Sequence, residues 1–155
     1  MTQSSLPQTI FPCLPLQTVL QIRDECLCLA SQRAARKLAR RFDRLFAPLG
    51  LTNGQFSMLV ALSSPWKPRL GELAEFLAMD ATTMTAAAKT LEKRGLVALI
   101  PDEKDARARR PVLTDTGHAI IAEAVPLWKA EHAALAREVT TTDAAALAQI
   151  LWQLG

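Results

Sequence analysis

The sequence has no tyrosine, and aromatic residues make up only 5% of its 155 positions. It also has no run of about eighteen apolar residues, the length that a membrane-spanning helix requires. The N-terminal stretch lacks the basic segment of a secretory signal and is interrupted by three prolines. These absences predict a cytoplasmic protein with no membrane partner.

Cysteine is scarce as well. The sequence has three cysteines, Cys13, Cys26 and Cys28, and all lie in the first fifth of the chain. An odd number of cysteines in a protein expected to be cytoplasmic argues against a structural disulfide framework. His118 and His132 lack the CxxC or HxxxH neighbours of a zinc site, so no metal is predicted. A P-loop, a dinucleotide-binding fingerprint and a nucleophile–base set are also missing, so neither an enzyme nor a cofactor is expected.

Half of the residues are hydrophobic, 21% are charged, and alanine and leucine dominate. This composition predicts one globular, mainly helical domain with a sizeable core. The net charge of +3 is a weak argument for nucleic acid, but the charge is unevenly distributed. Residues 30–46 carry six basic side chains against one acidic side chain, whereas residues 114–155 are net acidic. This asymmetry fits a DNA-facing and a DNA-remote part, and it equally fits a solvated helix face.

Helices are expected at both ends of the chain. Residues 1–15 should form a flexible or extended arm, because their prolines disfavour helix. Apolar residues at helical spacing predict one long helix from residue 17 to 46. A helix that starts at the Thr114 cap should be kinked or divided by Pro126, and a last helix should follow over residues 143–154. A long helix at one end of a small protein cannot bury all its sides alone, which favours a partner subunit.

Residues 52–114 follow the order helix, helix, turn, helix, strand, charged loop, strand. Thr52 has the spacing of a capping box and opens the first of these helices. A short helix is predicted over residues 70–77, and Asp80 is the expected N-cap of the next helix, over residues 81–94. This order is that of a helix–turn–helix followed by a β-hairpin wing, a device for gripping double-stranded DNA.

The helix over residues 81–94 is the candidate recognition helix. Such a helix must point polar side chains toward base edges and phosphates. The candidate DNA-binding side chains on its outer side are Thr82, Thr83, Thr85, Lys89 and Lys93. An ordinary amphipathic helix with exposed threonines is the alternative interpretation.

The wing makes the DNA-binding interpretation more specific. Two strands are predicted over residues 97–101 and 110–113, and a highly charged loop connects them. The candidate DNA-binding arginines of this loop and its return strand are Arg107, Arg109 and Arg110. In this position an arginine at the tip could enter the minor groove, while the others could contact phosphates. A charge run alone usually marks a solvated loop, but here it follows a helix–turn–helix at the right distance.

Residues 26–128 resemble the MarR family of bacterial winged-helix transcription regulators, and this region covers about two-thirds of the chain. The segments that carry the resemblance are PLGLTNGQFSMLVAL (48–62), LGELAEFLAMDATTMT (70–85), LEKRGLV (91–97) and DEKDARARRPVLTDTG (102–117). The resemblance implies a homodimer, intertwined through its first and last helices, that binds a pseudo-palindromic operator. It also implies that a ligand or an oxidant weakens DNA binding.

The resemblance assigns roles to individual residues. Asp105 and Arg107 match the acid–arginine pair of the wing tip, in which the arginine reaches into the minor groove and the aspartate braces it. Thr82, Thr83 and Lys89 match contacts of the recognition helix.

The sequence departs from the family at three arginine positions. Ala81, Ala86 and Ala106 stand where relatives often carry arginine. Fewer basic side chains neutralise fewer phosphates, so we expect weaker and less salt-dependent DNA binding.

The cysteines allow several interpretations. Cys28 falls near the reactive cysteine of the organic-hydroperoxide sensors within the family, but Phe42 and Asn53 replace the tyrosines that support that thiolate. A buried structural cysteine, a redox switch and a metal ligand are the alternatives. Cys13 is the candidate to pair with Cys26 or Cys28, within one chain or across a dimer.

The sequence therefore predicts a mainly α, winged helix-turn-helix fold with N- and C-terminal dimerisation helices. An arm over residues 1–15 precedes a MarR-type domain over residues 16–155. Residues 16–46 and 115–155 dimerise, and residues 52–114 bind DNA. The expected function is that of a transcription regulator, a repressor, that binds its operator as a homodimer and is released by a small-molecule effector or by cysteine oxidation. The alternative is a MarR-like dimer that has lost operator binding and acts through protein partners.

Overall fold

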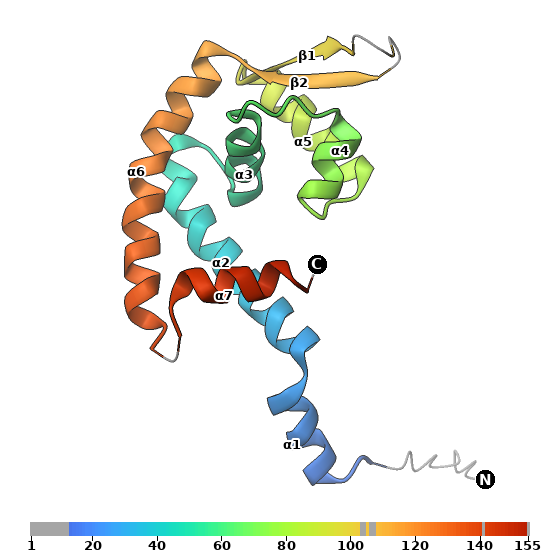
Figure 1. Cartoon of the computed structure of the whole chain (residues 1–155), viewed down its shortest axis with the longest axis vertical. Coiled ribbons are helices and arrows are strands. Elements are labelled where there is room, and N and C mark those ends of the chain that lie inside the picture. Colours follow the sequence, from blue (N-terminus) through green and yellow to red (C-terminus); the bar gives the residue numbers. More distant parts are fainter. Residues whose placement is uncertain (1–12, 103–104, 106–107, 141, 155) are drawn as a thin grey trace, which may run out of the picture. The chain divides into compact units, whose positions relative to one another are not determined.

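The computed structural model describes residues 13–102, 105, 108–140 and 142–154. Its elements are α1 (Leu16–Glu25), α2 (Leu27–Phe46), the 3-10 helix η1 (Ala47–Leu49), α3 (Asn53–Leu62), α4 (Leu70–Phe76), α5 (Ala81–Lys93), β1 (Val97–Pro101), β2 (Arg109–Leu113), α6 (Asp115–Glu138) and α7 (Ala144–Trp152) (Figure 1). Strands β1 and β2 form a two-stranded antiparallel sheet. The mainly α fold class with a small β-hairpin is therefore confirmed.

The chain divides into two compact units, residues 1–37 and 38–155. The prediction of one uninterrupted helix from residue 17 to 46 is wrong at Cys26, which separates α1 from α2. Cys26 is extended, with φ −74° and ψ 102°, and its Sγ accepts a hydrogen bond from the Leu29 N–H at 3.4 Å. The thiol thus satisfies a free N–H in the first turn of α2, as a serine N-cap does.

The core of the second unit is built from α2, α3, α4, α5, β1 and α6. Its large, fully buried apolar side chains are Phe46, Met58, Leu59, Leu73, Met84, Leu91 and Val97. The rings of Phe46 and Phe56 stack with centroids 4.4 Å apart. Each such side chain stabilises the fold by about 1.5–3 kcal/mol when fully buried. This core holds α5 by its inner face and leaves its other face exposed.

Helix starts lie where the sequence predicts caps. The side chain of Thr52 accepts from the Gln55 N–H, and the Gln55 side chain accepts from the Thr52 N–H, which completes the predicted capping box. Asp80, Thr114 and Asp143 cap α5, α6 and α7 through their side-chain oxygens. Each cap satisfies N–H groups that the first helical turn leaves free.

The start of α6 lies against the start of β1. Thr114 donates from its N–H to the Leu96 carbonyl at 3.2 Å and from its Oγ1 to the Gly95 carbonyl at 2.6 Å. A Cβ on Gly117 would lie 2.1 Å from the Leu96 carbonyl oxygen, so only glycine fits this approach. Further along, Pro126 lies within α6 without dividing it.

Arg41 of α2 holds α6 through two carboxylates. Its guanidinium donates to both carboxylate oxygens of Glu138 at 2.8 Å and also to Glu131. The neighbouring His132 ring lies 4.1 Å from the Trp128 ring, centroid to centroid. Partial burial lowers the pKa of His132, and the charge of Glu131 opposes that shift.

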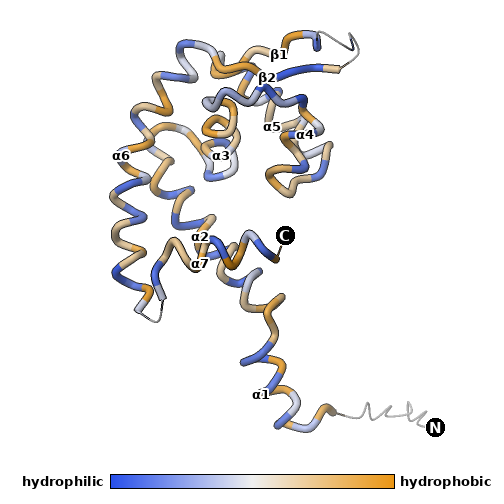
Figure 2. The backbone as a smooth tube through the Cα atoms, viewed as in Figure 1, coloured by the Kyte–Doolittle hydropathy of each residue, from blue (hydrophilic) through white to orange (hydrophobic). Residues whose placement is uncertain are grey.

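Hydrophilic and hydrophobic stretches alternate along the helices (Figure 2). Within the described ranges, no single helix is both long and apolar enough to cross a membrane. One pair of helices, Leu27–Leu49 and Asn53–Leu62, reaches the required length and composition jointly, with a bend of 75° between them.

Candidate nucleic-acid interface

Helices α4 and α5 form the helix–turn–helix, and residues 77–80 form its turn. Ala78 adopts a left-handed conformation, with φ 50°, which is uncommon for a residue other than glycine. The Met79 N–H donates to the Ala74 carbonyl at 2.8 Å and closes the turn. Leu73 is buried where α4 packs on α5. The turn and this packing position α5 relative to α4.

The Asp80 carboxylate caps the start of α5 by accepting two hydrogen bonds from Thr83. Its Oδ1 accepts from the Thr83 N–H at 2.8 Å, and its Oδ2 accepts from the Thr83 hydroxyl at 2.5 Å. These hydrogen bonds lower the pKa of the Asp80 carboxyl, because they stabilise its ionised form. Thr83 is exposed, as predicted, but its hydroxyl is directed to the cap.

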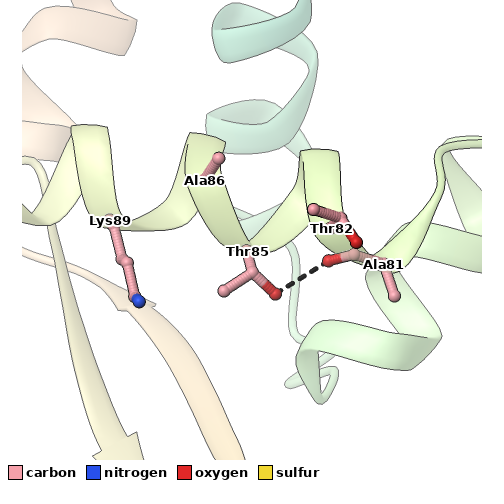
Figure 3. A pocket seen from close by; sticks show the side chains of 5 residues that line it. All are labelled: Ala81, Thr82, Thr85, Ala86 and Lys89. Carbon is pink, nitrogen blue, oxygen red and sulfur yellow. Dashed lines mark hydrogen bonds between the residues drawn. The ribbon is translucent and has the colours of Figure 1, made fainter.

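The outer face of α5 forms a shallow hollow of about 460 Å³ (Figure 3). The residues that line it are Ala81, Thr82, Thr85, Ala86 and Lys89. On the opposite face Met84, Ala88 and Leu91 are buried. Helix α5 is therefore amphipathic, and its outer face presents small side chains with one ammonium group.

The cations of α5 have different surroundings. Lys89 and Lys93 are exposed, and no carboxylate of the described residues forms an ion pair with either. Arg94, at the end of the helix, donates to the carbonyl of Gly50 at 2.6 Å and to that of Leu49 at 3.2 Å. The two lysines are thus available for an anionic partner, whereas Arg94 holds the end of α5 to the end of η1.

Strands β1 and β2 form the wing. Their register pairs Val97 with Leu113 at the base and Pro101 with Arg109 toward the tip. Just beyond this pair, the Asp102 N–H donates to the Ala108 carbonyl at 3.1 Å. The predicted hairpin is confirmed, with its second strand one residue longer than expected.

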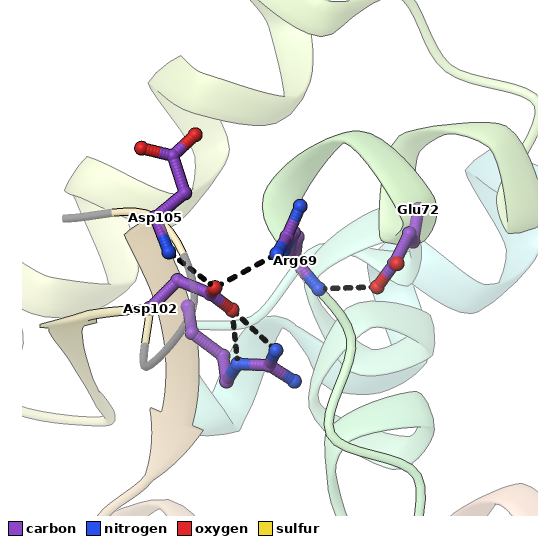
Figure 4. A network of polar contacts seen from close by, with 5 residues as sticks. Arg69, Glu72, Asp102 and Asp105 are labelled. Atoms are coloured by element: carbon purple, nitrogen blue, oxygen red, sulfur yellow. Dashed lines mark hydrogen bonds and ion pairs between the residues drawn. The ribbon is translucent and has the colours of Figure 1, made fainter. Parts of the chain in front are cut away.

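A buried carboxylate anchors the wing (Figure 4). The side chain of Asp102 has 0% exposure; its Oδ1 accepts from Arg69 Nη2 at 2.8 Å and from the Asp105 N–H at 3.1 Å. Its Oδ2 accepts from Arg110, at 3.0 Å from Nε and also from Nη2. The carboxylate raises the pKa of the Arg69 guanidinium. Because Arg69 directly precedes α4, this network ties the base of the wing tip to the helix–turn–helix.

The structure places the predicted wing residues differently from one another. Arg109 is exposed on β2, whereas Arg110 is half-buried and engaged by Asp102. Asp105 is described and exposed, but Arg107, its predicted partner, lies outside the described residues. Direct DNA contacts by these arginines stay predictions.

The sequence interpretation missed Arg69 and Asp102 as a pair. They are 33 positions apart, and no local spacing connects them. One feature of the sequence could have indicated an ion pair at Asp102. This residue directly follows a predicted strand, where its carboxylate can face the arginine-rich second strand of the hairpin.

The three cysteines all lie in the first unit. Cys13 and Cys28 are exposed and Cys26 is half-buried, so the interpretation as buried core cysteines is wrong for the single chain. Cys28 Sγ accepts from Gln32 Nε2 at 3.2 Å. Within the described residues, no group of three or more His, Cys, Asp or Glu side chains is arranged to hold a metal ion.

An apolar pocket of about 410 Å³ lies in the second unit, among α3, α4, α6 and α7. Its residues are Phe56, Ser57, Val60, Ala61, Phe76, Leu77, Val125, Trp128 and Trp152. Trp128 and Trp152 thus line a cavity. The ring centroids of Phe76 and Trp152 lie 5.9 Å apart.

Comparison with known proteins supports the fold. Residues 51–108 match the MarR family. The transcriptional regulator MosR of M. tuberculosis, solved in complex with DNA, is 35% identical, with a TM-score of 0.74 over 84% of this chain and 93% of that chain. The transcriptional repressor CouR, solved bound to a 23-mer DNA duplex, is 29% identical, with a TM-score of 0.77 over 87% of this chain and 96% of that chain.

The curated relatives match over a shorter region. The transcriptional activatory protein BadR of Rhodopseudomonas palustris is 32% identical over 91 residues, which are 57% of this chain. The match spans 52% of the length of BadR, and that to the regulator SarZ of Staphylococcus aureus spans 64% of SarZ.

Proposed function

Because the chain belongs to the MarR family of transcription regulators, which are not enzymes, we propose that it binds a pseudo-palindromic DNA operator as a homodimer. The observation that best supports DNA binding is the arrangement of α5 and the wing. Helix α5 exposes a face with two unpaired lysines among the described residues, and Asp102 holds the hairpin to the start of α4. Asp102 thus connects the hairpin to the helix–turn–helix, which supports the proposal that both parts bind DNA together.

In the proposed complex, α5 lies in the major groove. The exposed Lys89 and Lys93 neutralise phosphates or contact base edges, and Thr82 lies beside them. The wing carries Arg109 to the flanking backbone and Arg107 toward the minor groove. Two-fold symmetry would place a second recognition helix about 34 Å away, one turn of DNA. Such a regulator acts in the bacterial cytoplasm.

The homodimer is supported by apolar side chains that the single chain leaves exposed. In α1 and at the start of α2 these are Leu16, Val19, Ile22 and Leu27, and in α7 they are Ile150, Leu151 and Trp152. Exposed apolar residues of this density are typical of a surface that another subunit covers. Sedimentation equilibrium of the full chain tests the dimer, and a monomer at micromolar concentration contradicts it.

Selection of random double-stranded DNA by the purified full chain tests operator binding. We expect an enriched palindrome whose half-sites are about one helical turn apart. Recovery of no enriched sequence contradicts the proposal. It would favour the alternative, a dimer that acts through protein partners, for which Ala81 and Ala86 on the outer face of α5 are the motivating observation.

Variants then locate the contacts. Lys89→Ala should weaken binding to the selected site and, if Lys89 meets a phosphate, reduce the salt dependence of log K by about one unit. Lys129→Ala removes a lysine from α6 and is the matched control, expected to bind as the parent does. Arg107→Ala tests the wing: unchanged affinity at physiological salt contradicts its minor-groove role.

We further propose that the chain represses transcription and is released by an effector or by cysteine oxidation. The apolar pocket lined by Phe76, Trp128 and Trp152 has room for a small aromatic effector. The exposed Cys28 is open to oxidants. Operator affinity before and after peroxide, in the parent and in Cys28→Ser, tests the redox route. Unchanged affinity in the parent excludes it, and transcription in vitro from the selected site tests the sign of regulation.

A further inference from the structure

The hydroxyl groups of α5 are mostly committed to the helix itself. Thr85 and Thr90 donate to the backbone carbonyl four residues earlier, at 2.7 Å and 2.9 Å, and Thr83 donates to the N-cap carboxylate. Within the described residues, Thr82 is the one threonine of α5 whose hydroxyl has no such partner. The helix therefore offers an approaching base far fewer donors than its four threonines suggest.

The same hydrogen bond orients the methyl group of Thr85. Its hydroxyl points to the Ala81 carbonyl, and its methyl branch is directed away from that bond (Figure 3). Ala81 and Ala86 add two further methyl groups to the hollow, and Lys89 alone contributes a charge there. Three methyl groups thus surround the centre of this surface; Thr82 and Lys89 are its free donors, and the Thr85 hydroxyl, whose proton bonds to the Ala81 carbonyl, can only accept.

A surface of this kind restricts which bases it can recognise. Guanine is read best by arginine or lysine, and adenine by asparagine or glutamine, through paired hydrogen bonds. Among the residues that line the hollow, Lys89 is the one side chain of these types. The apolar group that DNA presents in the major groove is the C5-methyl of thymine, which small apolar side chains contact.

We propose that α5 selects thymine by its methyl group, through Ala81, Thr85 and Ala86. This inference rests on the proposed function, because it requires α5 to enter the major groove. Thr82 and Lys89 supply the polar contacts beside the methyl pocket. A cytosine methylated at C5 carries the same group, so methylation should strengthen binding to a site that has cytosine at one of those positions.

The test uses the half-site obtained by DNA selection with the full chain. Each thymine is replaced in turn by deoxyuridine, which preserves base pairing and removes only the methyl group. Affinity is measured by fluorescence anisotropy at constant salt. We expect at least one position in each half-site at which uracil weakens binding about fourfold, the effect of one buried methyl. Replacement of that uracil by thymine restores binding.

Variants of Thr85 assign the effect to a side chain. Thr85→Ser removes the methyl group and keeps the hydroxyl, so it should lose the preference for thymine over uracil at one position. Thr85→Val keeps a methyl group and should retain that preference. Thr90→Ser is the matched control, because Thr90 makes the same backbone hydrogen bond but does not line the hollow.

The outcomes separate this inference from its premise. If an operator is enriched and every uracil-substituted version binds as tightly as the thymine version, methyl recognition is wrong while operator binding stands. If Thr85→Ser keeps the full preference of the parent, the assignment to Thr85 is overturned. If no sequence is enriched, the proposed function itself fails and methyl recognition fails with it.

Discussion

Replacement of Asp102 by asparagine should destabilise the fold far more than an ordinary surface change. The carboxylate has no exposed area and accepts hydrogen bonds from two guanidinium groups and one backbone N–H. Its partners Arg69 and Arg110 keep 36% and 23% of their side-chain exposure. Asparagine has nearly the same shape, so the substitution removes the charge and turns one acceptor into a donor that faces an arginine.

The magnitude follows from which hydrogen bonds are lost. A hydrogen bond to a charged group stabilises a fold by about 1.5–3 kcal/mol, and the loss of one partner from a buried ion pair costs about 3–5 kcal/mol. Water can replace part of the loss, because Arg69 and Arg110 are partly exposed. We therefore expect Asp102→Asn to lower the free energy of unfolding by about 2–4 kcal/mol. In a chain of this size that corresponds to a decrease in Tm of roughly 5–12 °C.

The assay is urea unfolding of the full chain, followed by circular dichroism and by tryptophan fluorescence. Asp24→Asn is the matched control, because Asp24 pairs with Arg23 at 2.6 Å but the two side chains are 57% and 63% exposed. An exposed ion pair of this kind contributes little to stability, because solvent screens it. If Asp102→Asn costs no more than Asp24→Asn, the carboxylate does not anchor the wing.

Three further predictions concern the second unit. Gly117→Ala should lower the free energy of unfolding in urea by about 2–4 kcal/mol, because the added Cβ would meet the Leu96 carbonyl. Gly54→Ala, with open space around its Cβ, should be neutral or stabilising. Equal effects of the two substitutions contradict the close approach at Gly117. Arg41→Gln should cost about 1–2 kcal/mol through loss of the two carboxylate contacts to α6, and a Tm equal to that of the parent refutes this. Burial lowers the pKa of His132 below its usual 6.5, so the unfolded chain binds more protons than the folded chain, and stability should fall as the pH decreases through 6.5. His132→Gln should remove the part of the pH dependence of stability that His132 causes. A pH profile equal to that of the parent contradicts this assignment.

Much of the fold could be predicted from the sequence because the signals were local. Thr52, Asp80 and Thr114 cap their helices through residues at most three positions away, so their role is visible in the spacing. The same holds for the periodic burial of Met84 and Leu91 in α5. The break at Cys26 was not predicted, since helical periodicity continues across it and cysteine is not a usual cap.

The candidate site was predictable in position more than in chemistry. The sequence identified the outer face of α5, including Thr82, Thr85 and Lys89, which the structure brings together in one hollow. It could not show that the Thr85 hydroxyl bonds to the backbone, because a threonine in a helix has alternative rotamers. It also assigned Arg110 to DNA, whereas the structure engages this side chain with Asp102.

By itself the sequence determined the helix caps, the β-hairpin and the exposed face of α5, because each depends on residues within one or two helical turns or on adjacent strands. Only the tertiary structure decided which charged side chains form ion pairs within the protein. Asp102 is buried between Arg69 and Arg110 because β2 returns beside β1 and packs against α4, which Arg69 directly precedes. Such pairing depends on the path of the chain between distant segments, and no local pattern encodes it.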